Sequence, residues 1–502
     1  MGDLHFVCTL LFGGIVLNGR VIIFLIGKIL YFLGVVFAVP MLLGVGYEDV
    51  GGKIFAACMA ASFVVGFLFQ KLGTKITERY NLTNREGILT VVSTWITAVC
   101  FASVPFMAAG MLGPADAFFE AMSGLTTTGA TVLPDIEIWP RSLLFWRVWM
   151  HWIGGLGIIV IFIALLPRIS GGAAHLFNAE SSGFEGEKLL PRLKSTALAL
   201  FQIYIFLTGS TAILLLFCGL DLYDAVVHAI SAIGTGGFSS YNDSIVHFHS
   251  LGVELVIGLA MFCAGVNFSL YFKVKRNGFG ELLKDDEFRC YLFMYLTLVT
   301  VITIALTVHG FSPFRGFREA FFQVATFIST TGYVSADFDQ WPTFPKLCLT
   351  VLYFTGACAG STSGGIKISR LIVLARGVKE GVVKVLHPRE ARPILYNGHR
   401  IENSVFALVL SFFFTYIGIF VLFSLAVTAT GVDIQTAITG VLACLSSIGP
   451  GFGPVVGATG NFVSLPSAAK IMLAFVMLLG RLEMYTVLIL FSRKFWNGRS
   501  RW

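Results

Sequence analysis

Four short stretches rich in threonine and glycine recur along the chain, each in the same setting. They are Thr126–Thr131 (TTTGAT), Ile233–Phe238 (IGTGGF), Ser329–Tyr333 (STTGY) and Ser447–Gly451 (SIGPG). Each follows an amphipathic run of helical length and precedes a long apolar run, and one unit occupies roughly a hundred residues. Because an internal repeat outranks any single motif, the sequence predicts four copies of a helix, half-helix, loop and helix unit.

The composition indicates that lipid is the solvent for much of the chain. Of the 502 residues, 56% are hydrophobic, 13% are charged and 48 are Phe, an apolar excess that a soluble fold could not bury. The predicted fold is an all-α integral membrane protein with four pseudo-symmetric repeats around one pore. The net charge of +7 does not indicate nucleic-acid binding, because the basic residues lie in short connections between apolar runs. Such connections are typical of the cytoplasmic side.

The opposite connections are acidic or neutral, so the four loops are predicted to face outward. In the first repeat this connection carries Asp116, Glu120, Asp135 and Glu137, which are expected to attract cations at a pore mouth.

The apolar runs divide the chain into an N-terminal part and four repeats. Residues 1–20 are unassigned because their apolar stretch is short for a membrane span, and residues 21–85 form a hairpin with a basic cytoplasmic connector. The repeats are predicted at 86–193, 194–287, 288–399 with a broken second helix, and 400–502 with a basic C-terminus.

A short helix is predicted before each loop. These segments begin near Pro114, Asp221, Gly316 and Asp433, and each has about ten residues, too few to cross a membrane. Proline or an acidic residue near the start suits a helix N-terminus. The C-terminal ends of such half-helices carry partial negative charge, which favours a cation at the membrane centre.

The loops are suited to bind a cation through backbone carbonyl groups. Irregular backbone at membrane depth persists only where protein covers it or where it lines a cavity, and carbonyls can replace the hydration shell of potassium. Close helix packing is the alternative explanation for one such glycine, but four matched loops disfavour it. The predicted potassium site comprises Thr127, Thr128, Gly129, Gly234, Thr235, Gly236, Thr330, Thr331, Gly332, Ser447, Ile448 and Gly449.

A barrier is predicted on the cytoplasmic side of the loops. Arg481 lies in an otherwise apolar helix, and Gly356–Lys367 interrupts the second span of the third repeat at a similar depth. The alternatives are a salt bridge of Arg481 with Glu483, capping of carbonyls by Arg481, and tight helix packing at the glycines. The predicted gate residues are Arg481, Gly356, Gly360, Ser361, Thr362, Gly364, Gly365 and Lys367.

Other chemistry finds little support in the sequence. The nine cysteines have no CxxC spacing, and His247 and His249 have no acidic or cysteine partner at ligand spacing. No phosphate-binding loop, nucleophile elbow or HExxH motif occurs, and Asp285–Glu287 is expected to begin a helix. The chain is therefore predicted not to be an enzyme and to carry no cofactor.

The loops, together with Trp152–Val160, Gly356–Lys367 and Gly480–Glu483, resemble the Trk/Ktr/HKT superfamily of potassium transporters. The N-terminal hairpin and Gly449–Gly453 favour its bacterial TrkH/TrkG branch. The resemblance implies potassium uptake across the cytoplasmic (inner) membrane by a channel-like, multi-pass subunit, with Gly356–Lys367 as its gate. A sodium- or proton-coupled symporter that uses the same site is the alternative.

The resemblance also implies partners, namely a homodimer with two separate pores and a cytoplasmic ring of nucleotide-binding, TrkA-like regulator subunits. Membrane lipid is a further expected contact of the basic connections. In the plant branch, serine at the first-loop glycine is associated with sodium preference, so Gly129 favours potassium. Ile448 and Pro450 flank the fourth glycine where the other loops have threonine before it, which predicts an irregular fourth quarter.

Overall fold

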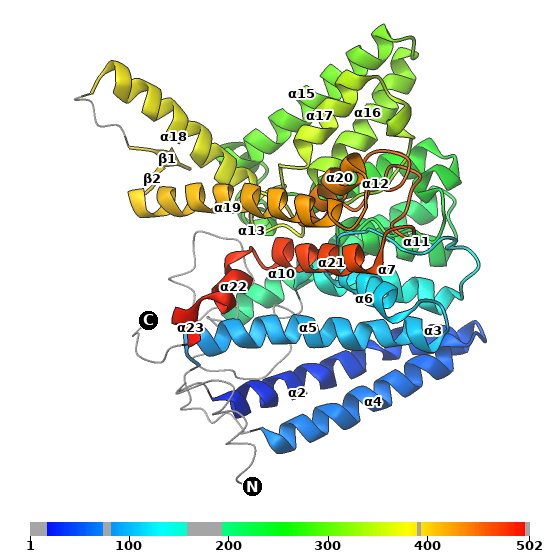
Figure 1. Ribbon diagram of the computed structural model, residues 1–502. Coiled ribbons are helices and arrows are strands. Elements are labelled where there is room, and N and C mark those ends of the chain that lie inside the picture. Colours follow the sequence, from blue (N-terminus) through cyan, green and yellow to red (C-terminus); the bar gives the residue numbers. More distant parts are fainter. Residues whose placement is uncertain (1–17, 74–81, 158–192, 389–392, 497–502) are drawn as a thin grey trace.

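The computed structural model describes residues 18–73, 82–157, 193–388 and 393–496 (Figure 1). This part of the chain is mostly helical, and its one sheet pairs β1 (Leu395–Tyr396) with β2 (His399–Arg400) in antiparallel fashion. The all-α prediction is therefore confirmed. The unassigned residues 1–17, most of the basic linker between repeats 1 and 2, and the final basic residues lie outside the described part, so the repeat boundaries stay predictions.

Six helical segments among the described residues are long and apolar enough to cross a membrane. They are Gly19–Gly46, Gly51–Leu72, Asn84–Ala108, Ala197–Phe217, Asp286–Val308 and Asn403–Thr428. Two bent pairs raise the number to eight if each pair is one span: Leu251–Ala264 with Phe268–Asn277, at 92°, and Ser467–Arg481 with Tyr485–Phe491, at 112°.

The N-terminal hairpin consists of α2 (Gly19–Val36), α3 (Ala38–Gly46) and α4 (Gly51–Leu72). In Figure 1, α2 and α4 lie side by side next to α5, and α2 packs against both. Glycines bring the two backbones close, since a Cβ atom on Gly27 would lie 2.9 Å from the carbonyl oxygen of Gly66, and the converse distance is also 2.9 Å. Small residues commonly permit such approach between membrane helices.

Four repeats follow the hairpin, and each contains a long helix, a half-helix, a loop and a further helix. The first comprises α5 (Asn84–Ala108), α6 (Pro114–Leu125) and α7 (Arg141–Leu156), and the second α10 (Leu193–Phe217), α11 (Leu222–Ile233), α12 (Leu251–Ala264) and α13 (Phe268–Asn277). The third comprises α15 (Asp286–Val308), α16 (Pro313–Ile328), α17 (Thr343–Leu352) and α18 (Ile368–Leu386), and the fourth α19 (Asn403–Thr428), α20 (Ile434–Ser446), α21 (Ser467–Arg481) and α22 (Tyr485–Leu488).

The remaining elements are short. They are η1 (Ser244–Phe248), α14 (Gly280–Lys284), η2 (Phe338–Gln340), η3 (Ile489–Phe491) and α23 (Arg493–Trp496).

The half-helices start at capping residues. The side chains of Asp221 and Asp433 accept hydrogen bonds from the first turns of α11 and α20, and α6 has Pro114 at its first position. The predicted third start, Gly316, was wrong. That helix begins at Pro313, because the Ser312 side chain caps the first turn and proline suits the position that follows. The four half-helices have 12, 12, 16 and 13 residues, so none can cross a membrane alone.

Contacts between neighbouring repeats close them into a ring. Helix α7 packs against α11, α12 against α16, and α21 against α6. The third and fourth repeats meet where the Tyr353 hydroxyl donates a hydrogen bond to the carbonyl oxygen of Pro450. All four half-helices therefore end in one shared central region.

The hairpin contact can be tested with Gly66→Val. The added side chain must push α2 and α4 apart, and such overpacking typically costs about 1–3 kcal/mol. We expect a lower thermal unfolding midpoint in detergent. Gly209→Val is the matched control, since a Cβ atom at Gly209 in α10 meets nothing within 4 Å. Equal midpoints for the two variants would contradict the close contact.

Candidate functional site

Each half-helix ends in the same unusual backbone. Its first marker is a residue with left-handed φ: Thr127 (56°), Thr235 (51°), Thr330 (57°) and Ser447 (57°). Two positions later comes a glycine with positive φ: Gly129 (80°), Gly237 (79°), Gly332 (86°) and Gly449 (96°). Left-handed φ at a non-glycine residue costs about 1–3 kcal/mol and is retained where the surroundings enforce it. Its recurrence in all four loops indicates one backbone design.

The hydrogen bonds of the residue between these markers repeat as well. In each loop its amide donates to a carbonyl in the last turn of the half-helix, at 2.8 to 3.0 Å. The donor and acceptor pairs are Thr128 with Ser123, Gly236 with Ser231, Thr331 with Thr326, and Ile448 with Ala443.

This pattern corrects the alignment of the second loop. The predicted potassium-site residues of this loop are Gly234, Thr235 and Gly236, but Gly237 holds the position of Gly129, and Gly234 is the C-cap of α11. The two glycines serve different purposes. Gly237 supplies positive φ, whereas a Cβ atom on Gly236 would overlap the ring of His151. The sequence alone cannot distinguish two adjacent glycines, because the difference lies in His151, which packs against Gly236 in the folded chain.

The four loops touch one another in a closed order. A Cβ atom on Gly129 would overlap the carbonyl oxygen of Gly236. The same relation joins Gly237 to Thr331, Gly332 to Ile448, and Gly449 to Thr128. All four glycines line one cavity of about 80 Å³. Each loop thus places a carbonyl oxygen against the glycine of the preceding loop, and the resulting set is called the carbonyl ring below.

The expected irregularity of the fourth quarter is not seen in its backbone. Ser447 and Gly449 repeat the positive φ values of the other loops, and the Ile448 amide repeats their hydrogen bond. The prediction failed because it weighed side-chain identity, whereas the Ile448 side chain is fully buried and only its backbone belongs to the ring.

On the other side of the ring, residues 353–367 separate α17 from α18, as the glycine pattern predicts. The amide of Gly364 donates to Thr330 Oγ1 at 2.8 Å, and Thr362 Oγ1 donates to the carbonyl of Ile233 at 3.1 Å. A Cβ atom on Gly364 would also overlap the carbonyl oxygen of Ser446. This intramembrane segment therefore lies directly beneath the ends of three half-helices.

The other predicted gate glycines shape this segment. The amide of Gly356 donates to the carbonyl of Ile366 at 2.6 Å and closes the base of the segment. Gly360 and Gly365 have φ of 71° and 68°, a region that favours glycine. The carbonyl of Gly360 accepts a hydrogen bond from the Phe268 amide at 3.1 Å, which ties the segment to α13.

Arg481, at the end of α21, joins the segment to the first repeat. Its NH1 donates to the carbonyl of Thr362 at 3.0 Å, and its NH2 donates to the carbonyls of Gly155, at 2.8 Å, and Gly154. Arg481 thus caps carbonyls at the end of α7, one of the alternatives left open above. Glu483 forms an ion pair with Arg370.

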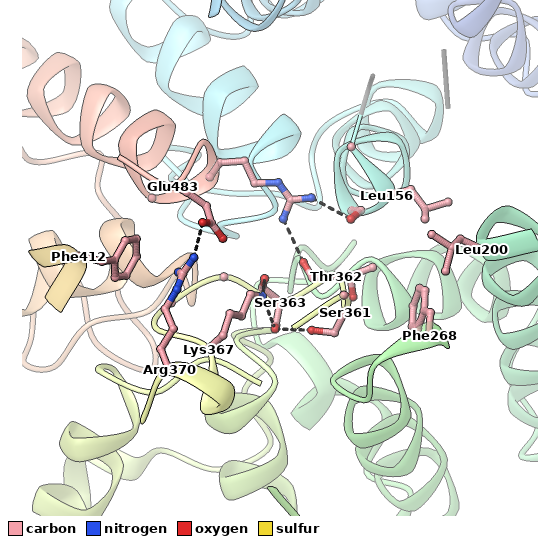
Figure 2. A pocket seen from close by; sticks show the side chains of 17 residues that line it. Leu156, Leu200, Phe268, Ser361, Thr362, Ser363, Lys367, Arg370, Phe412 and Glu483 are labelled. Atoms are coloured by element: carbon pink, nitrogen blue, oxygen red, sulfur yellow. Dashed lines mark hydrogen bonds and ion pairs between the residues drawn. The ribbon is translucent and has the colours of Figure 1, made fainter. Parts of the chain in front are cut away.

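A cavity of about 140 Å³ lies between these elements (Figure 2). Lys367 extends toward Ser363 and donates to Ser363 Oγ at 3.1 Å and to its carbonyl, while Ser361 Oγ lies 2.7 Å from Ser363 Oγ. The charged lining residues are Lys367, Arg370, Arg481 and Glu483. Three positive groups and one negative group leave a positive excess, which opposes the residence of a cation.

Glu287 was overlooked as a site residue. The predicted helix start is correct for Asp285, which caps α15, but the buried Glu287 carboxylate accepts hydrogen bonds from the amides of Ala359 and Ser369, both at 2.8 Å. Glu287 therefore holds together Ala359, inside the intramembrane segment, and Ser369, just after it. No local signal could reveal this, because its partners are 72 and 82 residues away.

Glu120 also differs from its expected role as an exposed acid at the mouth. Its side chain is fully buried and pairs with Arg147 at 2.8 Å. The sequence around Glu120 does not indicate this partner, because Arg147 is 27 positions away on α7.

A carbonyl ring held within a bundle of membrane-spanning helices, with a positively charged cavity beneath it, is the architecture of a multi-pass membrane protein for cation transport. The family model for TrkH, described as a cation transport protein, matches residues 53–500. This chain belongs to the TrkH family, as the sequence resemblance indicated.

Individual relatives match over nearly their whole length. The chain is 35% identical over 487 residues to the Trk system potassium uptake protein TrkH of Escherichia coli (strain K12), covering 95% of this chain and 99% of that protein. It is 33% identical to TrkG of the same strain, with equal coverage. The crystal structure of the potassium transporter TrkH from Vibrio parahaemolyticus superimposes with a TM-score of 0.86 at 33% identity, covering 96% of this chain and 100% of that one.

The crowding in the ring can be tested with Gly332→Ala. The added methyl group would collide with the carbonyl oxygen of Ile448, so we expect a clear loss of thermal stability in detergent. Gly310→Ala is the control, since Gly310 has φ of 94° but nothing within 4 Å of its Cβ position. The difference between the two midpoints isolates the contact from the cost of positive φ. Equal losses would argue against a closed ring.

Proposed function

We propose that this chain takes up potassium across the bacterial cytoplasmic membrane as the ion-conducting, channel-like subunit of a Trk-type system. The observation that carries the proposal is the carbonyl ring formed by Thr128, Gly236, Thr331 and Ile448 against the glycines of neighbouring loops. The relatives named as Trk system potassium uptake proteins support the same cargo.

The ring suits a cation of low charge density. Carbonyl oxygens from four loops replace part of its hydration shell, and the C-terminal ends of four half-helices add partial negative charge. The left-handed residues and glycines hold the carbonyls in place before an ion arrives, so little reorganisation is needed on binding. Potassium is the cargo of this site and not a resident cofactor.

The intramembrane segment and Arg481 form the gate below the ring. An ion that leaves the ring meets Arg481 and the carbonyl of Thr362, which are hydrogen-bonded at 3.0 Å across the path. Opening requires that this contact breaks and that the segment moves away from Thr330 and Glu287. Each of these hydrogen bonds joins two different elements, so a shift of α18 would loosen them together.

A route driven by membrane potential is favoured over coupled symport. Coupling to sodium or protons requires a titratable or sodium-binding group on the path. Among the described residues that line the lower cavity, Glu483 is the one acidic residue, and its carboxylate is paired with Arg370. Symport through the same ring is the second candidate, and it predicts uptake driven by a sodium or proton gradient at zero potential.

A homodimer and a cytoplasmic regulator ring are proposed as partners. Helix α18 projects from the bundle beside the β1–β2 hairpin (Figure 1), and it exposes Val378, Val382 and Val385. An apolar face on a projecting helix suits contact with protein or lipid. Any effect of nucleotide would reach the gate through such a regulator.

Reconstitution of the purified chain in liposomes tests this function. Potassium, rubidium and sodium fluxes are measured under an imposed potential and again under ion gradients alone. Selective potassium and rubidium flux driven by potential supports a channel-like route, whereas flux that requires a coupling gradient supports the symporter. A folded chain without flux, even after addition of the regulator subunits, would sink the proposal.

Gly129→Ser is expected to admit more sodium relative to potassium. The serine Cβ atom would collide with the carbonyl oxygen of Gly236 and displace one of the four ligating groups. The ratio of sodium to potassium permeability, measured by reversal potentials in planar bilayers, should rise. Gly110→Ser is the control, because Gly110 has φ of 67° and an open Cβ position. An unchanged ratio in Gly129→Ser would count against the ring as the filter.

Arg481→Ala is expected to raise flux while selectivity stays close to that of the parent protein. Removing the charge and its hydrogen bonds frees the segment, and a barrier lowered by about 1.4 kcal/mol would raise the rate about tenfold. Rubidium uptake into potassium-loaded liposomes measures the change. Arg315→Ala removes an exposed arginine that pairs with Glu319 on α16 and should leave the rate unchanged. A rate in Arg481→Ala no higher than in the parent would argue against a barrier at this residue.

A further inference from the structure

A second layer of side chains supports the carbonyl ring from behind. The position seven residues before the left-handed residue of each loop holds Glu120, His228, Gln323 and Gly440. In the first three repeats this side chain binds the irregular segment that follows the glycine. Glu120 accepts from the Val132 amide at 2.9 Å, His228 Nε2 lies 3.0 Å from Ser239 Oγ, and the Gln323 amide binds the backbone at Ala336.

In the fourth repeat, the residue next to this position binds the segment that follows the glycine. Gly440 has no side chain to offer, and Thr439 Oγ1 instead accepts from the Phe452 amide at 3.1 Å. The four loops therefore share one backbone but are held by four different chemistries. The first of these holds a buried ion pair.

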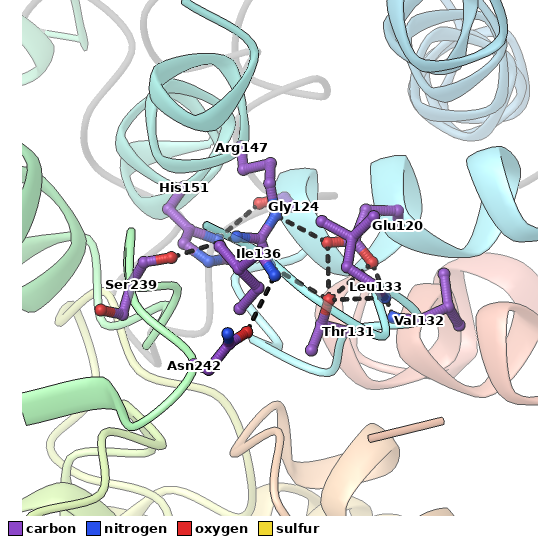
Figure 3. Close-up of polar contacts among 10 residues, drawn as sticks. All are labelled: Glu120, Gly124, Thr131, Val132, Leu133, Ile136, Arg147, His151, Ser239 and Asn242. Carbon is purple, nitrogen blue, oxygen red and sulfur yellow. Dashed lines mark hydrogen bonds and ion pairs between the residues drawn. The ribbon is translucent and has the colours of Figure 1, made fainter. Parts of the chain in front are cut away.

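Arg147 extends the support of the first loop to the second (Figure 3). Its Nε donates to Glu120 Oε1 at 2.8 Å and its NH2 donates to Thr131 Oγ1 at 3.1 Å, both within the first repeat. Its Nη1 donates to the carbonyl of Ser239 at 3.1 Å, in the irregular segment that follows the glycine of the second loop. The guanidinium also lies 4.1 Å from the centre of the Phe238 ring.

The geometry of this ion pair suits a spacer. The side chains of Glu120 and Arg147 are fully buried, and burying two charges gains little stability over apolar residues of the same size. The ion pair instead fixes the positions of several hydrogen-bond acceptors relative to one another, because the planar guanidinium group presents its donors in a rigid fork. Thr131 and Ser239 each lie two positions after the glycine of their loop, so the fork sets the distance between two adjacent quarters of the ring.

We propose that Glu120 and Arg147 are positioning residues that determine ion selectivity by holding the first and second quarters of the carbonyl ring at a fixed spacing. The proposal rests on the potassium-transport function proposed above. A ring that cannot contract ligates potassium well and the smaller sodium ion poorly. Loss of the fork lets the two quarters approach each other, which reduces this discrimination.

The test is the ratio of sodium to potassium permeability of the full chain, from reversal potentials in planar bilayers. Glu120→Gln keeps the volume but removes the charge that pairs with Arg147, and Arg147→Lys keeps the charge but loses the fork. We expect the ratio to rise several-fold in both. Glu254→Gln is the matched control, because Glu254 is paired with Arg318, with both contacts at 2.6 Å, between α12 and α16 and not at a loop.

A double variant separates positioning from folding. Glu120→Gln with Arg147→Gln leaves no unpaired buried charge, so the amount of folded protein should recover relative to Glu120→Gln. The ratio should stay raised, because the fork is still absent. A parent-like ratio in the double variant and in Arg147→Lys, or an equal rise in Glu254→Gln, would overturn the proposal. A parent chain that does not conduct potassium would instead overturn the proposed function.

Discussion

The structure depends on how polar backbone groups are satisfied at membrane depth. Four half-helices end there, and their last carbonyls need donors that lipid cannot supply. Some are met by hydroxyl groups of the chain itself, since Thr126 Oγ1 donates to the carbonyl of Met122 at 2.7 Å and Ser329 Oγ to that of Ala325 at 2.6 Å. The carbonyl of Ile233, at the end of α11, is met by Thr362 Oγ1 of the intramembrane segment, and Arg481 does the same for the carbonyls at the end of α7. Under the proposed function the carbonyls of the ring are met by the transported ion, so the site and the fold obey the same constraint.

The two sides of the ring are held differently. On the side of the segments that follow the glycines, buried side chains and backbone amides hold each loop in place, and Glu120 and Arg147 are a fully buried example. On the other side, hydrogen bonds join the segment to Thr330, Arg481 and Glu287. Each of these bonds connects two different elements, and under the proposed function they must break before an ion can pass. The proposed mechanism therefore combines a stiff selective element with a segment that moves.

The sequence could predict the features that repeat or that violate a local rule. Four glycine loops, a half-helix before each, an arginine in an apolar helix and a glycine-rich break are all visible along the chain. The second-loop alignment could not be resolved, because the reason for Gly236 is the ring of His151, which lies 85 positions away. Glu120 and Glu287 were misjudged for the same reason. A carboxylate looks solvated in sequence unless its distant partner is known.

The asymmetry behind the ring follows from having all four quarters in one chain. A symmetric tetramer must repeat each supporting interaction four times, and four buried ion pairs would multiply a desolvation cost that even one pair barely offsets. A single chain can confine the charge pair to one junction and use histidine and glutamine at the equivalent positions, and a threonine next to the equivalent position, in the other repeats. The repeated backbone and the unrepeated second layer then have separate roles. Under the two proposals made above, the backbone creates a site for a cation, and the second layer determines how far each quarter of the ring can contract around a smaller one.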